Sequence, residues 1–178
     1  MNSRNELPQF FKERGYKTGA EIGVLRGEFT EQFCQEGIKM YAIDTWENYL
    51  GYRGHPKEEP QAVIYETAKR RLAPYGCVLI KKSSMDALND FKDRSLDFVY
   101  IDGNHALPFI INDIYWWFRK VKNGGILAGH DYELNGWSPY QFQVCHVKYA
   151  VDLCAEIFGM KTQVLNRDKH PSWMWIKA

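Results

Sequence analysis

This 178-residue sequence has no long apolar runs and no strong excess of charge. No apolar stretch approaches the roughly 18 residues that a membrane-spanning helix needs, and the first residues carry no apolar core of a secretion signal. The formal net charge of +1 gives no electrostatic reason to expect nucleic acid or a membrane as a partner. We therefore expect a cytoplasmic protein that binds neither.

Paired cysteine motifs, internal repeats and low-complexity tracts are also missing. The 4 cysteines contain no Cys-x-x-Cys pair, which argues against a zinc knuckle or a thioredoxin-like site and favours free thiols. Hydrophobic residues make up 45% of the chain and charged residues 25%, the balance of an ordinary globular protein. The length suits one domain, so we expect residues 1–178 to form a single unit.

Strand and helix patterns alternate along the chain. Short apolar runs predict strands at 18–22, 39–43, 77–81, 96–101 and 126–129, followed by a hairpin of 161–165 and 173–177. Helical periodicity and end signals predict helices at 8–14, 28–36, 60–73, 84–91, 107–121 and 146–158. Such alternation predicts an α/β fold with a mostly parallel sheet and helices on both faces. Ligands of such sheets bind at the carboxyl ends of the strands.

A glycine-bearing turn follows the first predicted strand. Glu21 lies one residue before the end of this strand, and Gly23 and Gly27 allow the backbone to pass close to a ligand. The spacing is not the Gly-x-Gly-x-x-Gly of dinucleotide sites, and a nearby carboxylate suits a sulfonium or an ammonium better than a diphosphate. A tight turn that needs glycine only for packing is the alternative.

The second and third predicted strands end in polar residues. Asp44, followed by Thr45, could accept hydrogen bonds from ribose hydroxyls, or it could be a turn aspartate. Ser84, followed by Met85, could cap the next helix and could also contact an adenine edge.

The fourth and fifth predicted strands end in acidic and imidazole groups. Asp102 and His105 follow the fourth strand, and His130 and Asp131 follow the fifth. If these strands are neighbours, Asp102, His130 and Asp131 form an oxygen and nitrogen cluster that could hold a divalent metal. His105 could accept a proton, since an unperturbed histidine has a pKa near ~6.5. A turn with a surface histidine is the alternative.

Five segments carry a resemblance to a known family. They are 21–27 (Glu-Ile-Gly-Val-Leu-Arg-Gly), 41–44 (Tyr-Ala-Ile-Asp), 83–88 (Ser-Ser-Met-Asp-Ala-Leu), 97–105 (Asp-Phe-Val-Tyr-Ile-Asp-Gly-Asn-His) and 124–132 (Gly-Gly-Ile-Leu-Ala-Gly-His-Asp-Tyr). Together they resemble class I S-adenosylmethionine-dependent methyltransferases, most of all the bacterial branch related to macrocin-type sugar and catechol-type O-methyltransferases. The resemblance spans residues 18–132 and is only topological beyond them.

This resemblance implies a three-layer Rossmann-like methyltransferase fold with seven strands, the last hairpin contributing one antiparallel strand. It implies S-adenosylmethionine as cofactor. Glu21, Gly23 and Gly27 would surround its methionine part, and Asp44 would hold its ribose. Ser84 and Met85 would flank its adenine. In the metal-dependent members, the residues that hold magnesium would match Asp102, His130 and Asp131. His130 replaces the usual acid at its position, and histidine is a softer ligand than magnesium prefers.

The expected reaction is transfer of a methyl group to a hydroxyl of a small molecule, with a sugar or glycan precursor as one candidate. Asp102, His105 and His130 are the expected catalytic residues, with a metal or a histidine taking part in loss of the hydroxyl proton. Segments 51–59 and 132–142 are the expected lids. Trp137, Tyr140 and Phe142 could stack on the acceptor or cover the core edge.

Two other functions remain open from the sequence. One is an NAD-linked oxidoreductase on the same architecture, against which the missing third glycine counts. The other is a non-catalytic domain that binds a nucleoside or a partner protein. The sequence does not decide the methyl acceptor or whether the chain forms a homo-oligomer.

Overall fold

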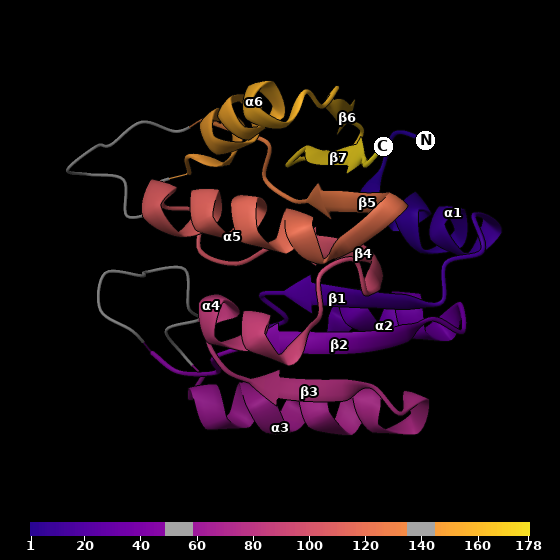
Figure 1. Ribbon diagram of the computed structural model, residues 1–178. Coiled ribbons are helices and arrows are strands. Elements are labelled where there is room, and N and C mark those ends of the chain that lie inside the picture. Colours follow the sequence, from indigo (N-terminus) through magenta and orange to yellow (C-terminus); the bar gives the residue numbers. More distant parts are fainter. Residues whose placement is uncertain (49–58, 135–144) are drawn as a thin grey trace.

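A seven-stranded sheet with the order β3-β2-β1-β4-β5-β7-β6 forms the centre of the computed structural model, which describes residues 1–48, 59–134 and 145–178 (Figure 1). Parallel pairing joins β3 to β2, β2 to β1, β1 to β4 and β4 to β5, whereas β7 runs antiparallel to both β5 and β6. This confirms the predicted α/β methyltransferase-type sheet. The strands are β1 Thr18–Ile22, β2 Lys39–Asp44, β3 Val78–Lys81, β4 Leu96–Ile101, β5 Val121–Gly129, β6 Gln163–Leu165 and β7 Ser172–Ile176.

Helices cover both faces of the sheet. Side chains from α1 (Leu7–Glu13), α2 (Glu28–Gln35) and α3 (Gln61–Leu72) pack on one face, and side chains from α4 (Ser84–Ala87), α5 (Leu107–Lys120) and α6 (Val147–Phe158) pack on the other. Short 3₁₀ helices precede α1 and follow α3 and α4, at Arg4–Glu6, Ala73–Tyr75 and Leu88–Asp90. Among the described residues, no helix has the length and apolar character to cross a membrane.

Alternation along β4 shows how the sequence separates the two halves of the core. Phe98 and Tyr100 join the cluster under α1, α2 and α3, whereas Val99 and Ile101 join the cluster under α4, α5 and α6. Successive side chains of a strand point to opposite faces, so a strand covered on both sides is apolar at every one of these positions. All four side chains are buried.

Two boundaries differ by more than two residues from the sequence-based prediction. The helix predicted at 84–91 is a single turn of α-helix that ends at Ala87 and continues as 3₁₀ helix, and Ser83, not Ser84, accepts the capping hydrogen bond from the Asp86 amide. The strand predicted to begin at residue 126 begins at Val121, which pairs with Leu96. A register shift between the strands absorbs the extra residues.

The order of the strands reverses between β1 and β4. From β1 the chain proceeds to β2 and β3 on one side, and from β4 it proceeds to β5 on the other. The carboxyl ends of these parallel strands meet at one edge of the sheet (Figure 1). Crevices at such a switch point are the usual ligand sites of doubly wound sheets.

Candidate functional site

Two adjoining cavities lie at this edge. The acidic cavity, of about 300 Å³, has carboxylates in its wall, namely Glu21, Glu28, Asp44 and Asp102. The apolar cavity, of about 400 Å³, is walled in part by Ile22, Ile43, Met85 and Phe109. Both include Gly23, Asp44 and Gly103 in their linings, so the cavities meet where β1, β2 and β4 end. Together they form an elongated site with a charged half and an apolar half.

Gly23 allows the ends of β1 and β4 to touch. Its backbone is left-handed, with φ at +85°, and a Cβ atom on it would lie 2.2 Å from the carbonyl oxygen of Asp102. On either side, the Gly23 amide donates to Ile43 O at 2.9 Å and the Asp102 amide donates to Ile22 O at 2.7 Å. Only glycine fits this conformation and this approach.

Asp44 anchors the turn after β1. Its Oδ2 accepts hydrogen bonds from the Val24 amide at 2.9 Å and the Leu25 amide at 3.0 Å, and its Oδ1 accepts one from the Trp46 amide at 2.9 Å. A carboxylate has about four lone-pair positions, so about one remains for a ligand. Leu25 and Trp46 both hold positive φ angles, of 53° and 45°. Asp44 is therefore a turn aspartate that also faces both cavities, and Thr45 lines the apolar one.

Gly27 lies outside the described lining of both cavities. It is the left-handed N-cap of α2. A Cβ atom there would lie 3.0 Å from the side chain of Leu72. In this structure Gly27 serves the packing of α2 against α3, and a cofactor contact through it stays a prediction.

Glu21 is a buried carboxyl at the wall of the acidic cavity. Its side chain is 2% exposed and accepts a hydrogen bond from the hydroxyl of Thr30 on α2. Burial raises the pKa of Glu21 to about 8, with the charge of Asp102 acting in the same direction and the Thr30 bond opposing it. Glu21 is thus largely neutral at pH 7, until a cation approaches.

Ser84 and Met85 line the apolar cavity, as does Asp113, which belongs to none of the sequence motifs. The Ser84 hydroxyl donates to Asp113 on α5 and accepts a hydrogen bond from Trp117 Nε1 at 2.9 Å. Burial raises the pKa of Asp113 to about 7. A signal was present, because Asp113 falls between Ile110 and Trp117 on the buried stripe of α5, where a carboxyl is unexpected.

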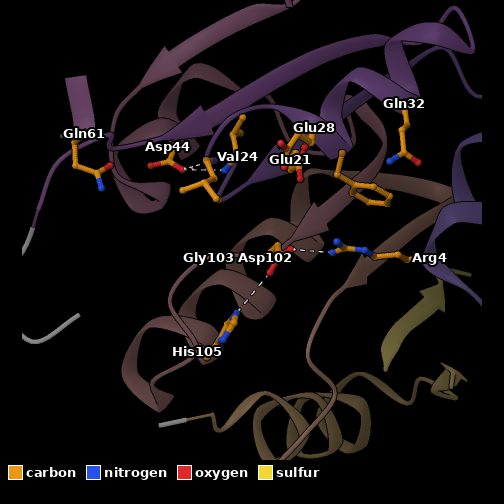
Figure 2. A pocket seen from close by; sticks show the side chains of 13 residues that line it. Arg4, Glu21, Val24, Glu28, Gln32, Asp44, Gln61, Asp102, Gly103 and His105 are labelled. Atoms are coloured by element: carbon orange, nitrogen blue, oxygen red, sulfur yellow. Dashed lines mark hydrogen bonds and ion pairs between the residues drawn. The ribbon is translucent and has the colours of Figure 1, made fainter. Parts of the chain in front are cut away.

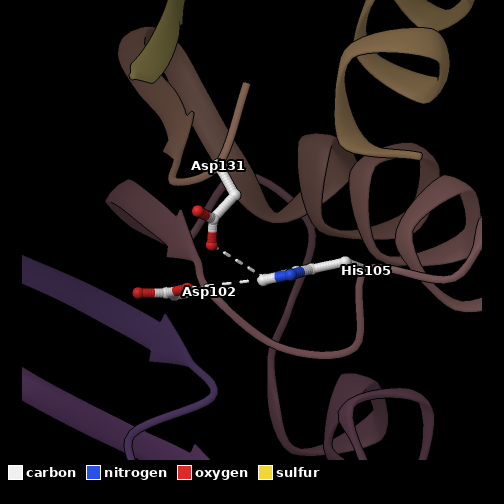
Figure 3. A group of neighbouring side chains, drawn as sticks. All are labelled: Asp102, His105 and Asp131. Carbon is white, nitrogen blue, oxygen red and sulfur yellow. Dashed lines mark ion pairs between the residues drawn. The ribbon is translucent and has the colours of Figure 1, made fainter. Parts of the chain in front are cut away.

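Asp102, His105 and Asp131 form a mixed cluster where β4 and β5 end (Figure 3). One ligand-type atom from each lies within 4.8 Å of the others. His105 Nε2 lies 3.6 Å from Asp102 Oδ1 and 3.4 Å from Asp131 Oδ2, is buried and makes no hydrogen bond to any residue that the structure describes. Two carboxylates around an unpartnered imidazole nitrogen fit a divalent cation. Asp131 also has a left-handed backbone, with φ at 51°.

Neighbouring charges shift the pKa values of His105 and Asp131 in this cluster. Burial lowers the pKa of His105, but the nearby carboxylate of Asp102, followed by the charges of Asp131 and Glu133, outweighs burial and raises it. Burial works the other way on Asp131, yet nearby His130 and His105 hold the pKa of that carboxyl below its usual range. The cluster is therefore arranged to hold positive charge between its acids.

His130 flanks this cluster. Its Nδ1 lies 3.2 Å from Asp131 Oδ2 and 3.9 Å from Asp102 Oδ1. The predicted meeting of Asp102, His130 and Asp131 depended on β4 and β5 being neighbours, which they are. The tightest group includes His105 rather than His130, whose part in metal binding stays a prediction.

Arg4 is a second site residue that no sequence motif indicated. Its Nη1 lies 3.3 Å from Asp102 Oδ2, across 98 positions of sequence, and its side chain lines the acidic cavity. No local pattern in the sequence signals a contact of that range. The two oxygens of Asp102 thus face different groups, Oδ2 toward Arg4 and Oδ1 toward His105 (Figure 2).

The two predicted lids fall mostly outside the described residues. Segment 51–59 is described only at Glu59, which pairs with Arg26, and segment 132–142 only at 132–134. Trp137, Tyr140 and Phe142 also lie outside the described residues.

Comparison with known families settles the relationship of this chain. A family model described as a methyltransferase domain matches residues 20–132, which include every strand end described above except that of the C-terminal hairpin. The chain belongs to this methyltransferase domain family. The match counts against the NAD-linked alternative on the same architecture.

Solved structures with the same fold include O-methyltransferases. The chain resembles the O-methyltransferase of Bacillus cereus in complex with S-adenosylhomocysteine, with a TM-score of 0.72 and 13% identity over 98% of this chain and 80% of that one. It also resembles TomG of Streptomyces achromogenes, an O-methyltransferase solved with S-adenosylmethionine, with a TM-score of 0.65 and 15% identity over 98% and 79% of the two chains. At these identities the likeness concerns the fold.

Sequence relatives are larger proteins. Protein y4gI of Sinorhizobium fredii is 27% identical over an alignment of 134 residues, which covers 68% of this chain and 14% of that protein. Protein R132 of Acanthamoeba polyphaga mimivirus is 33% identical over 64 residues, 34% of this chain and 29% of that protein. The methyltransferase chain therefore spans less than a third of the length of either relative.

Proposed function

We propose that this chain is an S-adenosylmethionine-dependent O-methyltransferase that acts on a hydroxyl group of a small molecule. The observation that carries the proposal is the meeting of an acidic and an apolar cavity at Gly23, Asp44 and Gly103. A nucleoside with a cationic amino-acid extension matches this site, because its base suits the apolar cavity and its positive charge suits the acidic cavity. Membership of the methyltransferase domain family supports this assignment. We also propose that residues 1–178 form one domain, since one sheet joins both ends of the chain.

The cofactor would lie along both cavities. Asp44, between them, would accept one ribose hydroxyl with its remaining lone pair, and Met85 would contact the adenine in the apolar half. Because the Ser84 hydroxyl already bonds Asp113 and Trp117, its contact with adenine would be limited to packing. Glu21 and Asp102 would offset the positive charge of the sulfonium and ammonium groups in the acidic half.

S-adenosylmethionine supplies an electrophilic methyl group. As the acceptor oxygen bonds to the methyl carbon and the carbon–sulfur bond breaks, the hydroxyl proton must pass to a base, leaving S-adenosylhomocysteine and the methyl ether. His105 and His130 stand at the cluster beside the acidic cavity and are the candidate bases. Asp102 would orient the acceptor from the same strand end.

A divalent cation fits the same cluster. Asp102, His105 and Asp131 would hold it, and its charge would lower the pKa of a bound hydroxyl. In that arrangement His105 is a ligand, and His130 is the base that remains. The imidazole ligand favours a cation such as manganese over magnesium.

The test is formation of S-adenosylhomocysteine by the full chain with a panel of hydroxylated sugars and aromatic compounds, with and without added divalent metal. We expect turnover with at least one acceptor and a loss of about 100-fold or more in His105→Ala or His130→Ala. His146→Asn is the matched control, since His146 Nδ1 accepts the Leu107 amide at 3.1 Å and lines neither cavity.

Two results would count against this function. Full activity in both histidine variants would remove their assigned roles. Cofactor binding without turnover on any acceptor would favour the non-catalytic nucleoside-binding alternative.

A further inference from the structure

The two ends of the chain meet beside the candidate site. The Ser3 hydroxyl donates to Asp168 Oδ1 at 2.8 Å, and the Arg4 amide donates to Asp168 Oδ2 at 2.7 Å. Asp168 belongs to the connection between β6 and β7. In addition, the Arg167 amide donates to the carbonyl of Asn2 at 2.9 Å. These bonds hold the backbone at Arg4 in one place.

The Arg4 side chain reaches from that anchor into the acidic cavity. Its guanidinium lies 5.1 Å from the ring centre of Phe29 and pairs with Asp102 at 3.3 Å. Figure 2 shows Arg4 and Gln32 at one end of this cavity and Gln61 with Asp44 at the other. Asp102 and Gly103 lie between the two ends.

Charge makes this end of the cavity different from the rest. The described lining of the acidic cavity contains four carboxyl groups, and Arg4 is its one lysine or arginine. An anionic group in this cavity would be repelled by Glu28, Asp44 and Asp102 wherever it lay away from Arg4. A guanidinium is also the side chain best suited to a carboxylate, because its parallel N–H groups match the two oxygens.

We propose that Arg4 binds the α-carboxylate of the amino-acid part of the cofactor and so determines recognition of that part. This inference rests on the proposed function, since it takes S-adenosylmethionine as the ligand. The ribose belongs beside Asp44, so the amino-acid part extends past Gly23 and Asp102 toward Arg4. Its ammonium meets the carboxylates, and its carboxylate meets the arginine. Asp168 is then a positioning residue that acts through the backbone of Arg4.

Arg4 lies outside residues 20–132, the part that matches the family model. The recognition element is thus supplied by a segment of this chain that the shared domain does not include. The connection between β6 and β7, which holds that segment, is also outside the match.

Two ligands that differ only in the amino-acid part test this assignment. S-adenosylhomocysteine has the carboxylate, and 5′-methylthioadenosine lacks the whole amino-acid part; both have an uncharged sulfur. Calorimetry on the full chain would give the affinity of each for the native protein, Arg4→Met, Arg4→Lys and Asp168→Asn. Arg14→Met is the matched control, since Arg14 is exposed, near the same end of the chain, and outside both cavities.

For Arg4→Met we expect S-adenosylhomocysteine to bind roughly 10-fold to 100-fold more weakly, as for loss of a charge-assisted hydrogen bond. The affinity for 5′-methylthioadenosine should stay within about twofold, because that ligand has no carboxylate. Arg4→Lys should recover part of the loss, Asp168→Asn should show a smaller loss for S-adenosylhomocysteine alone, and Arg14→Met should bind both ligands as the native chain does. Thermal unfolding of each variant checks that it is folded.

Three results would overturn the inference. An equal loss for both ligands would mean that Arg4 acts through Asp102 or the fold. Unchanged affinity for both would mean that the carboxylate binds elsewhere. A native chain that bound neither ligand would overturn the proposed function itself, and the inference with it.

Discussion

Thr30 on α2 donates its hydroxyl to the buried carboxyl of Glu21 at the end of β1. This bond joins the wall of the acidic cavity to the helix that covers it. It also provides one polar partner for a carboxyl that is 2% exposed and lies near the charges of Asp102 and Asp44. The protonation state of Glu21 therefore couples the stability of the fold to pH.

Replacing Glu21 with glutamine should flatten the pH dependence of stability. Burial raises the pKa of Glu21 from 4.5 to about 8, so between these values the folded chain holds a proton that the unfolded chain releases. Its contribution to the free energy of unfolding is fully present below about pH 4.5 and is lost as pH rises through about 8. Glutamine keeps an acceptor for Thr30 and has no charge to bury.

Urea unfolding of the native chain and Glu21→Gln at pH 5, 7 and 9 measures this difference. We expect the variant to gain stability relative to the native chain as pH rises, by on the order of a few kcal/mol at most. Parallel curves for the two proteins would show that Glu21 does not carry this linkage.

Gly23→Ala should destabilise the chain more than Gly15→Ala. Both glycines are left-handed, with φ of +85° and +78°, so alanine is strained at either position by about 1–2 kcal/mol. At Gly23 the new Cβ would also meet the Asp102 carbonyl at 2.2 Å, whereas at Gly15 nothing lies within 4 Å. Chemical unfolding of both variants isolates the cost of the clash. Equal losses would mean that the contact between the ends of β1 and β4 is unimportant.

Ser84→Ala should lower the free energy of unfolding by roughly 1–3 kcal/mol, because it leaves two buried polar groups without a partner. These groups are Asp113 and the Nε1 of Trp117. Ser95→Ala is the matched control, since the Ser95 hydroxyl oxygen is buried without a hydrogen bond to the described part of the chain and its removal should cost nothing. Tryptophan fluorescence during urea unfolding would give the free energy of unfolding of both variants. A loss at Ser95 that equals the loss at Ser84 would contradict this expectation.

Manganese should bind the chain more tightly than magnesium, and His105→Asp should narrow that difference in affinity. The cluster of Asp102, His105 and Asp131 offers one imidazole and two carboxylates, and carboxylate-only sites suit magnesium better. Calorimetric titration with each metal in the absence of cofactor provides the measurement, with Asp131→Ala expected to abolish binding. Asp90→Ala, an exposed carboxylate paired with Lys82, is the control and should bind as the native chain does. Metal binding unaffected by Asp131→Ala would place the ion elsewhere.

Local sequence patterns predicted the succession of strands and helices along the chain. The strand Leu96–Ile101 has its predicted bounds because its apolar residues continue across both faces. The start of β5 was wrong because Asn123-Gly124-Gly125 indicates a break, whereas pairing of Val121 with Leu96 extends the strand through it. Pairing between strands can override a local turn signal.

The sequence by itself determined the α/β alternation and the placement of Glu21, Asp44, Asp102 and Asp131 at strand ends, because these depend on periodicities that neighbouring residues express. Only the tertiary structure decided which groups meet. The pairing of Arg4 with Asp102, the network of Ser84 and Asp113, and the place of His105 between two carboxylates all depend on contacts between distant segments. Such contacts follow from the packing of the whole sheet and its helices, which no local pattern contains.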